Sequence, residues 1–264
     1  MRFTVALAQC AYPSDPDMLS QVDAWCEEAS AQGADLVVFP EDLMSPRPLS
    51  PEELCQIAEP LDGTFARGVA ACADRHGVWV AFTLYERNDE GGQPYNTAVL
   101  VDDAGTIVAS YRKTHLYDAH GVHESERTGR GEALFVPVDT PFGKMGLAIC
   151  YDLRFPEVAR AAALAGADVL LLPAAWHDGP EKAAHWETLL RARAIENELF
   201  VLAAGRAGER YVGRSMVVDP LGRVRARAPG KDETLVICSV DTAEVAKARE
   251  AMPLLAHRRP ELYA

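Results

Sequence analysis

Two segments of the chain repeat one short pattern, and this repeat constrains the fold more than any other feature. Residues 33–40 read Gly-Ala-Asp-Leu-Val-Val-Phe-Pro, and residues 166–173 read Gly-Ala-Asp-Val-Leu-Leu-Leu-Pro. A helical pattern precedes each copy, and a similar apolar segment lies further upstream of each. A short, continuous apolar run is typical of a parallel strand that is buried on both faces. We therefore expect two similar βαβ halves, with a chance match over eight residues as the alternative.

Helical and strand-like patterns alternate along the rest of the 264 residues. Apolar residues recur at helical spacing over 17–32, where Ser14 or Asp15 is the expected cap. Further helices are expected over 64–76, 156–164 and 181–198. Strands are expected over 3–8, 35–40, 78–85, 97–101, 106–111, 143–150, 169–173, 200–204, 211–218 and 234–240. This alternation predicts an α/β fold, and because no linker separates the halves we expect one domain over residues 1–264.

The chain is acidic, with 26 Lys and Arg against 39 Asp and Glu and a formal net charge of −13. This charge disfavours binding to nucleic acids and anionic membranes. Arg223, Arg225 and Arg227 alternate along an expected strand without interleaved aromatic residues, so we interpret them as a solvated strand face. No apolar run approaches the roughly 20 residues of a membrane span, and the N-terminus lacks a signal peptide's apolar core. We expect neither a nucleic-acid nor a membrane partner, and a cytoplasmic location.

Several common catalytic motifs are missing from the sequence. There is no Walker-type loop, no G-x-G-x-x-G and no G-x-S-x-G, which disfavours phosphoryl transfer, dinucleotide chemistry and serine hydrolysis. His115, His120 and His123, with Asp118 and Glu124, have side chains of the kinds that bind zinc. They fall in an expected loop without an H-E-x-x-H motif, so we expect no metal and no cofactor.

Three chemically reactive residues stand where expected strands end. Glu41 follows the strand at 35–40, Lys113 follows the strand at 106–111, and Cys150 ends the strand at 143–150. In α/β proteins, ligands gather at the carboxyl ends of strands. Taken singly, a glutamate caps a turn, a lysine is a surface charge, and a cysteine is a buried thiol. Three different reactive groups at strand ends favour a catalytic site.

The segments around these residues resemble the three signature segments of the nitrilase superfamily, in the same order and at similar separations. They are Phe-Pro-Glu at 39–41, Tyr-Arg-Lys-Thr-His-Leu at 111–116 and Cys-Tyr-Asp-Leu-Arg-Phe-Pro-Glu at 150–157. Residues 185–187 and 191–197 also resemble the helix after the nucleophile segment in that family. The resemblance implies a four-layer αββα sandwich and a homodimer or larger homo-oligomer. It also implies a Glu-Lys-Cys triad of Glu41, Lys113 and Cys150, with Glu124 as a second glutamate.

The chemistry of these side chains agrees with the implied roles. An amide carbonyl is a poor electrophile, so its hydrolysis needs a strong nucleophile and a stabilised oxyanion. Glu41 would take the proton of Cys150 and deliver it to the leaving amine. Lys113 would favour the thiolate and, with the backbone N–H of Tyr151, stabilise the oxyanion. A thioester on Cys150 would then be hydrolysed by a water that Glu41 activates, and Glu124 would orient Lys113 or position the substrate.

The residues after the nucleophile point to the substrate class. True nitrilases usually have Cys-Trp-Glu there, whereas Cys-Tyr-Asp at 150–152 resembles the omega-amidase and deaminated-glutathione amidase branches, which implies a small amide substrate. Arg154 would bind a substrate carboxylate or form a structural salt bridge. Tyr151, Trp176 and His177 are the other expected substrate-binding residues, with packing as the alternative for Trp176. Other open interpretations are a nitrilase, an N-carbamoyl hydrolase, a Cys-His peptidase, and a non-catalytic binding or assembly protein.

Overall fold

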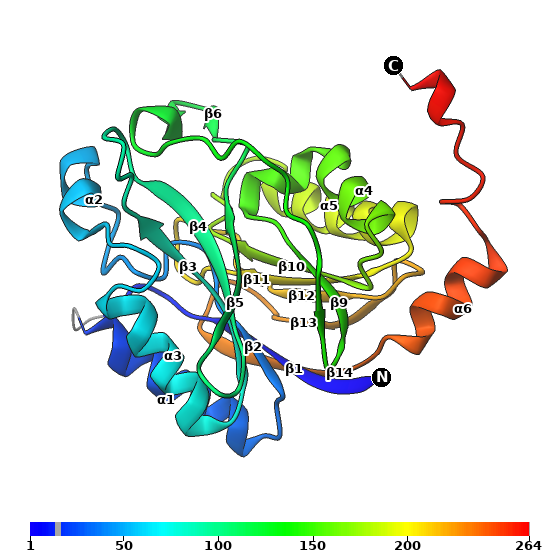
Figure 1. Cartoon of the computed structure of the whole chain (residues 1–264), viewed down its shortest axis with the longest axis horizontal. Coiled ribbons are helices and arrows are strands. Elements are labelled where there is room, and N and C mark those ends of the chain that lie inside the picture. Colours follow the sequence, from blue (N-terminus) through cyan, green and yellow to red (C-terminus); the bar gives the residue numbers. More distant parts are fainter. Residues whose placement is uncertain (14–16, 264) are drawn as a thin grey trace.

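Two six-stranded sheets form the centre of the computed structural model, which describes residues 1–13 and 17–263 (Figure 1). The first sheet has the order β14-β1-β2-β3-β4-β5 and the second the order β13-β12-β11-β10-β9-β8. The strands of the first sheet are β1 (Arg2–Gln9), β2 (Leu36–Val38), β3 (Trp79–Glu86), β4 (Tyr95–Val101), β5 (Ile107–Arg112) and β14 (Thr234–Asp241). Those of the second are β8 (Val138–Thr140), β9 (Gly143–Leu147), β10 (Val169–Ala174), β11 (Phe200–Gly205), β12 (Met216–Val218) and β13 (Val224–Arg227).

The two sheets repeat one topology. Strands β1, β2 and β3 are parallel neighbours, and so are β9, β10 and β11. Each parallel trio has one antiparallel strand on one side, β14 or β8, and two on the other. The repeated segments at 33–40 and 166–173 contain β2 and β10, the central strand of each trio. The expected pair of similar βαβ halves is therefore confirmed.

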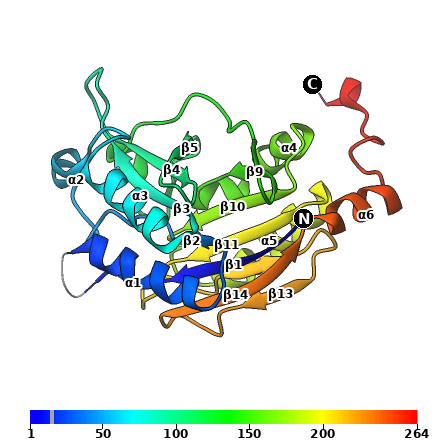
Figure 2. The ribbon, with the colours of Figure 1, turned by 60° about the horizontal axis from the view of Figure 1, so that its bottom comes forward.

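Helices cover the outer face of each sheet and complete a four-layer αββα sandwich (Figure 2). Helices α1 (Met18–Ala31) and α3 (Thr64–His76) pack on the first sheet, and α4 (Pro156–Leu164) and α5 (Lys182–Asn197) on the second. This arrangement confirms the expected fold class. The short helix α2 (Pro51–Ile57) and helix α6 (Ala243–Ala251) lie outside these layers in the described part of the chain, and neither was expected from the sequence.

Strand β1 shows why the sandwich forms. Successive side chains of a strand point to opposite faces of its sheet. Val5 and Leu7 therefore pack between the sheets, in the cluster that contains Leu171 of the second sheet. Ala6 and Ala8 belong to the cluster beneath α1 and α3. Because both faces are covered, the strand is apolar in nearly every position.

Several other elements differ locally from those expected. Strand β9 ends at Leu147 rather than at 150, and β12 covers only Met216–Val218 of the expected 211–218. The polar stretch from 118 contains β6 (Asp118–Ala119), β7 (Val122–His123) and the 3-10 helix η1 (Glu124–Glu126). Ser14 and Asp15 lie outside the described residues, and Asp17 caps α1 by accepting a hydrogen bond from the backbone N–H of Ser20 at 3.2 Å.

Two other expectations concern the surface. The three arginines Arg223, Arg225 and Arg227 lie at the exposed positions of β13 and at its entrance, as expected of a solvated face. Within residues 1–13 and 17–263, every helix is too short or too polar to cross a bilayer.

Candidate active site

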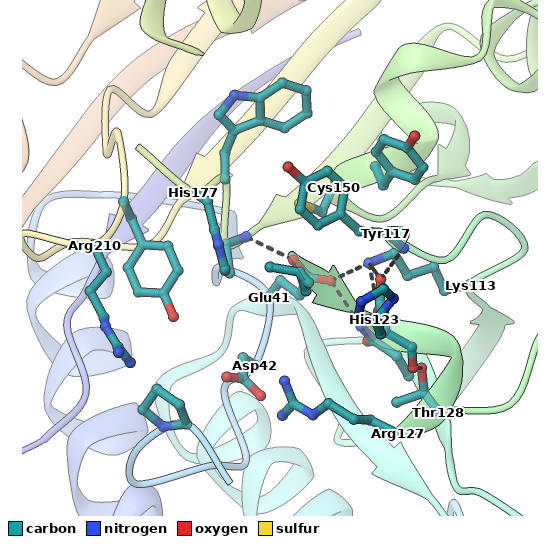
Figure 3. A pocket seen from close by; sticks show the side chains of 18 of the residues that line it. Glu41, Asp42, Lys113, Tyr117, His123, Arg127, Thr128, Cys150, His177 and Arg210 are labelled. Carbon is teal, nitrogen blue, oxygen red and sulfur yellow. Dashed lines mark hydrogen bonds and ion pairs between the residues drawn. The ribbon is translucent and has the colours of Figure 1, made fainter. Parts of the chain in front are cut away.

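Glu41, Lys113 and Cys150 converge at the edge of the sandwich where the parallel strands end (Figure 3). Glu41 follows β2 after Phe39 and Pro40, and Lys113 is the residue after β5. Cys150 follows β9 and begins the 3-10 helix η2 (Cys150–Arg154). All three line one cavity of about 720 Å³. Residues separated by more than a hundred positions along the chain thus share one pocket.

Hydrogen bonds fix the carboxylate of Glu41 from both of its oxygens. Oε1 accepts from Lys113 Nζ and from Asn96 Nδ2, each at 2.8 Å, and Oε2 accepts from the backbone N–H of Ala175 at 2.8 Å. The buried guanidinium of Arg206 also donates from Nε to the backbone carbonyl of Glu41 at 2.9 Å. Burial opposes ionisation of Glu41, but Lys113 and the hydrogen bonds outweigh it and lower its pKa. Glu41 is therefore a carboxylate at neutral pH.

Lys113 is buried between two carboxylates. Its Nζ donates to Glu41 at 2.8 Å and to both oxygens of Glu124 at 2.8 and 2.9 Å. Burial alone would lower the pKa of Lys113, but Glu124 and Glu41 raise it well above its ordinary value. Glu124 also accepts from the backbone N–H of Tyr117 at 2.6 Å, which fixes its position. The ammonium is thus a permanent and immobile cation.

The thiol of Cys150 is 8% exposed and lies at a strained turn with φ of +43°. Few residues other than glycine adopt positive φ, and such positions cluster at functional sites. Burial and the negative charge of Glu41 raise the pKa of Cys150 well above its ordinary value, although Lys113 acts in the opposite direction. At neutral pH Cys150 is therefore a neutral thiol in the same cavity as the Glu41 carboxylate, rather than the thiolate that Lys113 alone would favour.

The buried carboxylate of Asp152 ties the segment that carries Lys113 to the segment that carries Cys150. It accepts hydrogen bonds from the hydroxyl of Tyr111 at 2.9 Å and contacts His115 Nδ1 at 2.8 Å. Both partners come from the strand end beside Lys113, whereas Asp152 lies two residues after Cys150. The relative position of ammonium and thiol is set by this contact.

The four expected substrate-binding residues all line the cavity: Tyr151, Arg154, Trp176 and His177. Arg154 stacks over the Trp176 ring, with its Cζ 4.6 Å from the ring centroid. Among the described residues Arg154 makes no ion pair, so it does not form the structural salt bridge considered above. Burial lowers the pKa of His177, and the imidazole is therefore neutral at pH 7.

Other residues of the site were not anticipated from the sequence. Asn96 is a buried amide within the apolar strand β4, and that contrast was the available signal. Tyr117 and Lys182 line the cavity from segments far apart in the chain, and their hydroxyl and ammonium are hydrogen-bonded at 2.8 Å. Nothing in the local sequence marks either of them. No group of three or more His, Cys, Asp or Glu within the described ranges is arranged to hold a metal ion.

The neutral state of the thiol has a measurable consequence for stability. The folded pKa of Cys150 lies above the unfolded value of 9.0, so above that pH the unfolded chain releases a proton that the folded chain retains. The wild type should then lose unfolding free energy relative to a Cys150→Ala variant, by up to about 1.4 kcal/mol per pH unit. Urea unfolding of both proteins at pH 7 and pH 10 measures this difference. If the free energy of unfolding changes equally with pH in both proteins, Cys150 is not buried as a thiol.

A buried thiol beside a carboxylate and an ammonium, at the strand ends of an αββα sandwich, defines a cysteine-dependent hydrolase of C–N bonds. The chain belongs to the carbon-nitrogen hydrolase family, whose model matches residues 4–250. This match confirms the resemblance to the nitrilase superfamily.

Three relatives illustrate the likeness. The chain is 38% identical to the deaminated glutathione amidase of Bos taurus, over 97% of this chain and 83% of that protein. A carbon-nitrogen hydrolase from Helicobacter pylori G27 superposes with a TM-score of 0.90 at 28% identity, over 100% of this chain and 97% of the other. A mutant of the amidase from Nesterenkonia sp. AN1, with acrylamide added at its active site cysteine, gives a TM-score of 0.83 at 29% identity, over 99% and 98% of the two chains.

Proposed function

We propose that this protein hydrolyses a small carboxylate-bearing amide to a carboxylic acid and an amine or ammonia, through a thioester on Cys150. The observation that carries the proposal is the convergence of Cys150, Glu41 and Lys113 in one cavity, with Lys113 Nζ 2.8 Å from the Glu41 carboxylate. The active site cysteine named for the Nesterenkonia amidase supports the choice of nucleophile.

Acylation begins when Glu41 takes the proton of the Cys150 thiol and the sulfur adds to the amide carbonyl. The negative charge that develops on the carbonyl oxygen is stabilised by Lys113 and by the backbone N–H of Tyr151. Glu41 then delivers its proton to the amide nitrogen, the C–N bond breaks, and the amine leaves. Because Lys113 is already held by two carboxylates, it needs no rearrangement as this charge develops.

Deacylation repeats these steps with water as the nucleophile. Glu41 takes a proton from the water, which adds to the thioester carbonyl. The C–S bond then breaks, the sulfur recovers the proton, and the acid leaves. Glu124 positions Lys113 in both half-reactions, as supported by its two hydrogen bonds to Nζ.

Two features support a carboxylate-bearing substrate. A cavity of about 720 Å³ is within the range of sites for drug-sized ligands, which is more space than a simple aliphatic amide needs. Arg154 faces this cavity without a carboxylate partner among residues 1–13 and 17–263, and a planar guanidinium can bind a carboxylate through two hydrogen bonds. Relatives that act on deaminated glutathione, such as the Bos taurus enzyme, make that compound a suitable first candidate.

A substrate panel tests the proposed function. It should contain 2-oxoglutaramate, deaminated glutathione, simple aliphatic amides and nitriles, with release of ammonia or amine as the measurement. We expect turnover of the acidic amides and little or none of the nitriles. Turnover of nitriles alone, or of nothing in the panel, would contradict the proposal.

Replacing Arg154 by alanine should separate acidic from neutral substrates. A charge-assisted hydrogen bond contributes about 1.5–3 kcal/mol, so KM for an acidic amide should rise about 10- to 100-fold. KM for a neutral aliphatic amide should change little, because that substrate has no carboxylate to bind. Steady-state kinetics on both substrates provides the test, and equal effects on the two would remove Arg154 from carboxylate recognition.

We also propose that the protein is a homodimer or larger homo-oligomer. The segment after α6 extends away from the two sheets (Figure 1) and exposes large apolar side chains, those of Met252, Leu262 and Tyr263. Exposed apolar groups of this kind are typical of surfaces that contact another chain. Light scattering coupled to size-exclusion chromatography measures the mass, and a monomer at micromolar concentration would contradict the proposal.

A further inference from the structure

Lys182 is a buried cation of the active-site cavity, and it has no carboxylate partner in the described part of the chain. It is the first residue of α5, is 9% exposed and lines the same cavity as Cys150. Its Nζ donates to the hydroxyl of Tyr117 at 2.8 Å and lies 5.0 Å from the centroid of that ring. Among the residues that the structure describes, no carboxylate lies within ion-pair distance of Lys182.

This placement is unfavourable in the unliganded protein. Burying an ammonium without a counter-ion costs several kcal/mol, and the N-terminal end of a helix is itself positive. The Tyr117 hydroxyl satisfies only one of the three donors of Lys182. Lys113 and Lys231 show the usual arrangement, because each has a carboxylate within 2.9 Å. The described residues therefore supply no anion to Lys182. An anion bound in the cavity could contact its ammonium group.

The cavity lining beside Lys182 includes a second cation, Arg154, for which the described residues supply no ion pair. The indole N–H of Trp176 donates to the backbone carbonyl of Lys182 at 3.1 Å, and Arg154 stacks on the same indole ring. Lys182 contacts the ring of Tyr117 and Arg154 that of Trp176, so the two cations rest on different aromatic side chains.

The charges of the cavity lining also favour an anionic ligand. Four of its cations have no carboxylate within ion-pair distance in residues 1–13 and 17–263, namely Arg127, Arg154, Lys182 and Arg210. Among the lining carboxylates, Glu41 and Glu124 bind Lys113 and Asp178 binds Lys231. Asp42 accepts hydrogen bonds from the hydroxyls of Tyr12 and Tyr85. The remaining carboxylate of the lining is that of Glu126, which is exposed to solvent. An acidic chain with a net charge of −13 thus concentrates unpaired positive charge where its substrate binds.

We propose that Lys182, together with the hydroxyl of Tyr117, binds a carboxylate of the substrate, and that this carboxylate is distinct from the one that Arg154 binds. The inference rests on the proposed amidase function and makes its substrate an amide with two anionic groups. Lys182 donates to one oxygen of the carboxylate. Tyr117, whose oxygen already accepts from Lys182, donates its own proton to the same group.

The test measures binding rather than turnover. In a Cys150→Ala background, calorimetry gives Kd for N-glutarylglycine, whose amide lies between two carboxylates, and for its two monomethyl esters. Adding Lys182→Met should weaken binding of the diacid and of one monoester about 10- to 100-fold. Binding of the other monoester should stay nearly unchanged, because that ester lacks the carboxylate in question. Arg154→Ala should show the reciprocal pattern.

Three results would overturn the inference: no measurable binding of the diacid, equal weakening of all three ligands by Lys182→Met, or sensitivity of both variants to the same ester. Lys247→Met is the matched control, because Lys247 is exposed on α6, and it should leave all three Kd values unchanged. Hydrolysis of the diacid by the wild type separates the two proposals. If Lys182→Met weakens binding of the diacid but the wild type does not hydrolyse it, only the proposed amidase function is contradicted. If the wild type hydrolyses the diacid but Lys182→Met leaves its binding unchanged, only the proposed Lys182 subsite is contradicted.

Discussion

Replacing Cys150 by alanine is expected to lower amide turnover by at least about 10⁴-fold while the protein remains folded. Without the sulfur no thioester forms, and neither Glu41 nor Lys113 can substitute as a nucleophile at neutral pH. Alanine removes only one atom from a small side chain in a turn, so the melting temperature at pH 7 should change little. Product release and thermal unfolding of the same preparation measure both quantities.

A matched cysteine variant controls for loss of a thiol as such. Cys55 is exposed on α2, and Cys55→Ala should retain full activity. Substantial turnover by Cys150→Ala would contradict the assignment of the nucleophile. Equal losses in the two variants would do so as well, because they would trace inactivation to something other than the site.

Replacing Lys113 by methionine is expected to lower the free energy of unfolding by about 3–5 kcal/mol at pH 7, in addition to abolishing turnover. The substitution leaves the carboxylates of Glu41 and Glu124 buried and close together without their shared cation. Their mutual repulsion raises the pKa of one of them in the variant. The variant should therefore recover stability as the pH falls from 7 towards 5, whereas the wild type should not. Urea unfolding at both pH values measures this.

A double variant isolates the electrostatic cause. Glu124→Gln added to Lys113→Met removes one of the two opposing charges and should restore part of the lost stability at pH 7. The same Glu124→Gln change in the wild type should destabilise the protein, because there it removes a partner of Lys113. Strictly additive effects of the two substitutions would show that the three groups do not form one buried charge cluster.

The continuous apolar runs of the chain predicted the pair of βαβ halves, whereas the four-layer sandwich was implied by the family resemblance. Strands β2 and β10 are covered on both faces, so their apolar runs are continuous and carry the internal repeat. Glu41 comes shortly after β2, and the segments around Glu41, Lys113 and Cys150 also carry the family resemblance. Glu41, Lys113 and Cys150 could therefore be named before their geometry was known.

The features that sequence reasoning missed depend on contacts between distant residues. Strand β12 is shorter than expected because the backbone N–H of Ser215 donates to the side chain of Gln9 at 2.8 Å instead of joining the ladder. Strand β9 likewise ends early where the N–H of Ile149 donates to Asp152 at 2.9 Å. Lys182 looks like an ordinary helical lysine until the fold places it against Tyr117. No local pattern encodes such pairings.

The central claim is that acyl transfer passes through one covalent intermediate on Cys150, and partitioning between water and hydroxylamine tests it most directly. An amide and a methyl ester with the same acyl group should give the same ratio of hydroxamate to acid at a given hydroxylamine concentration, because both reach the same thioester. Ratios that differ between the two substrates would show that no common acyl-enzyme exists, and would contradict the account.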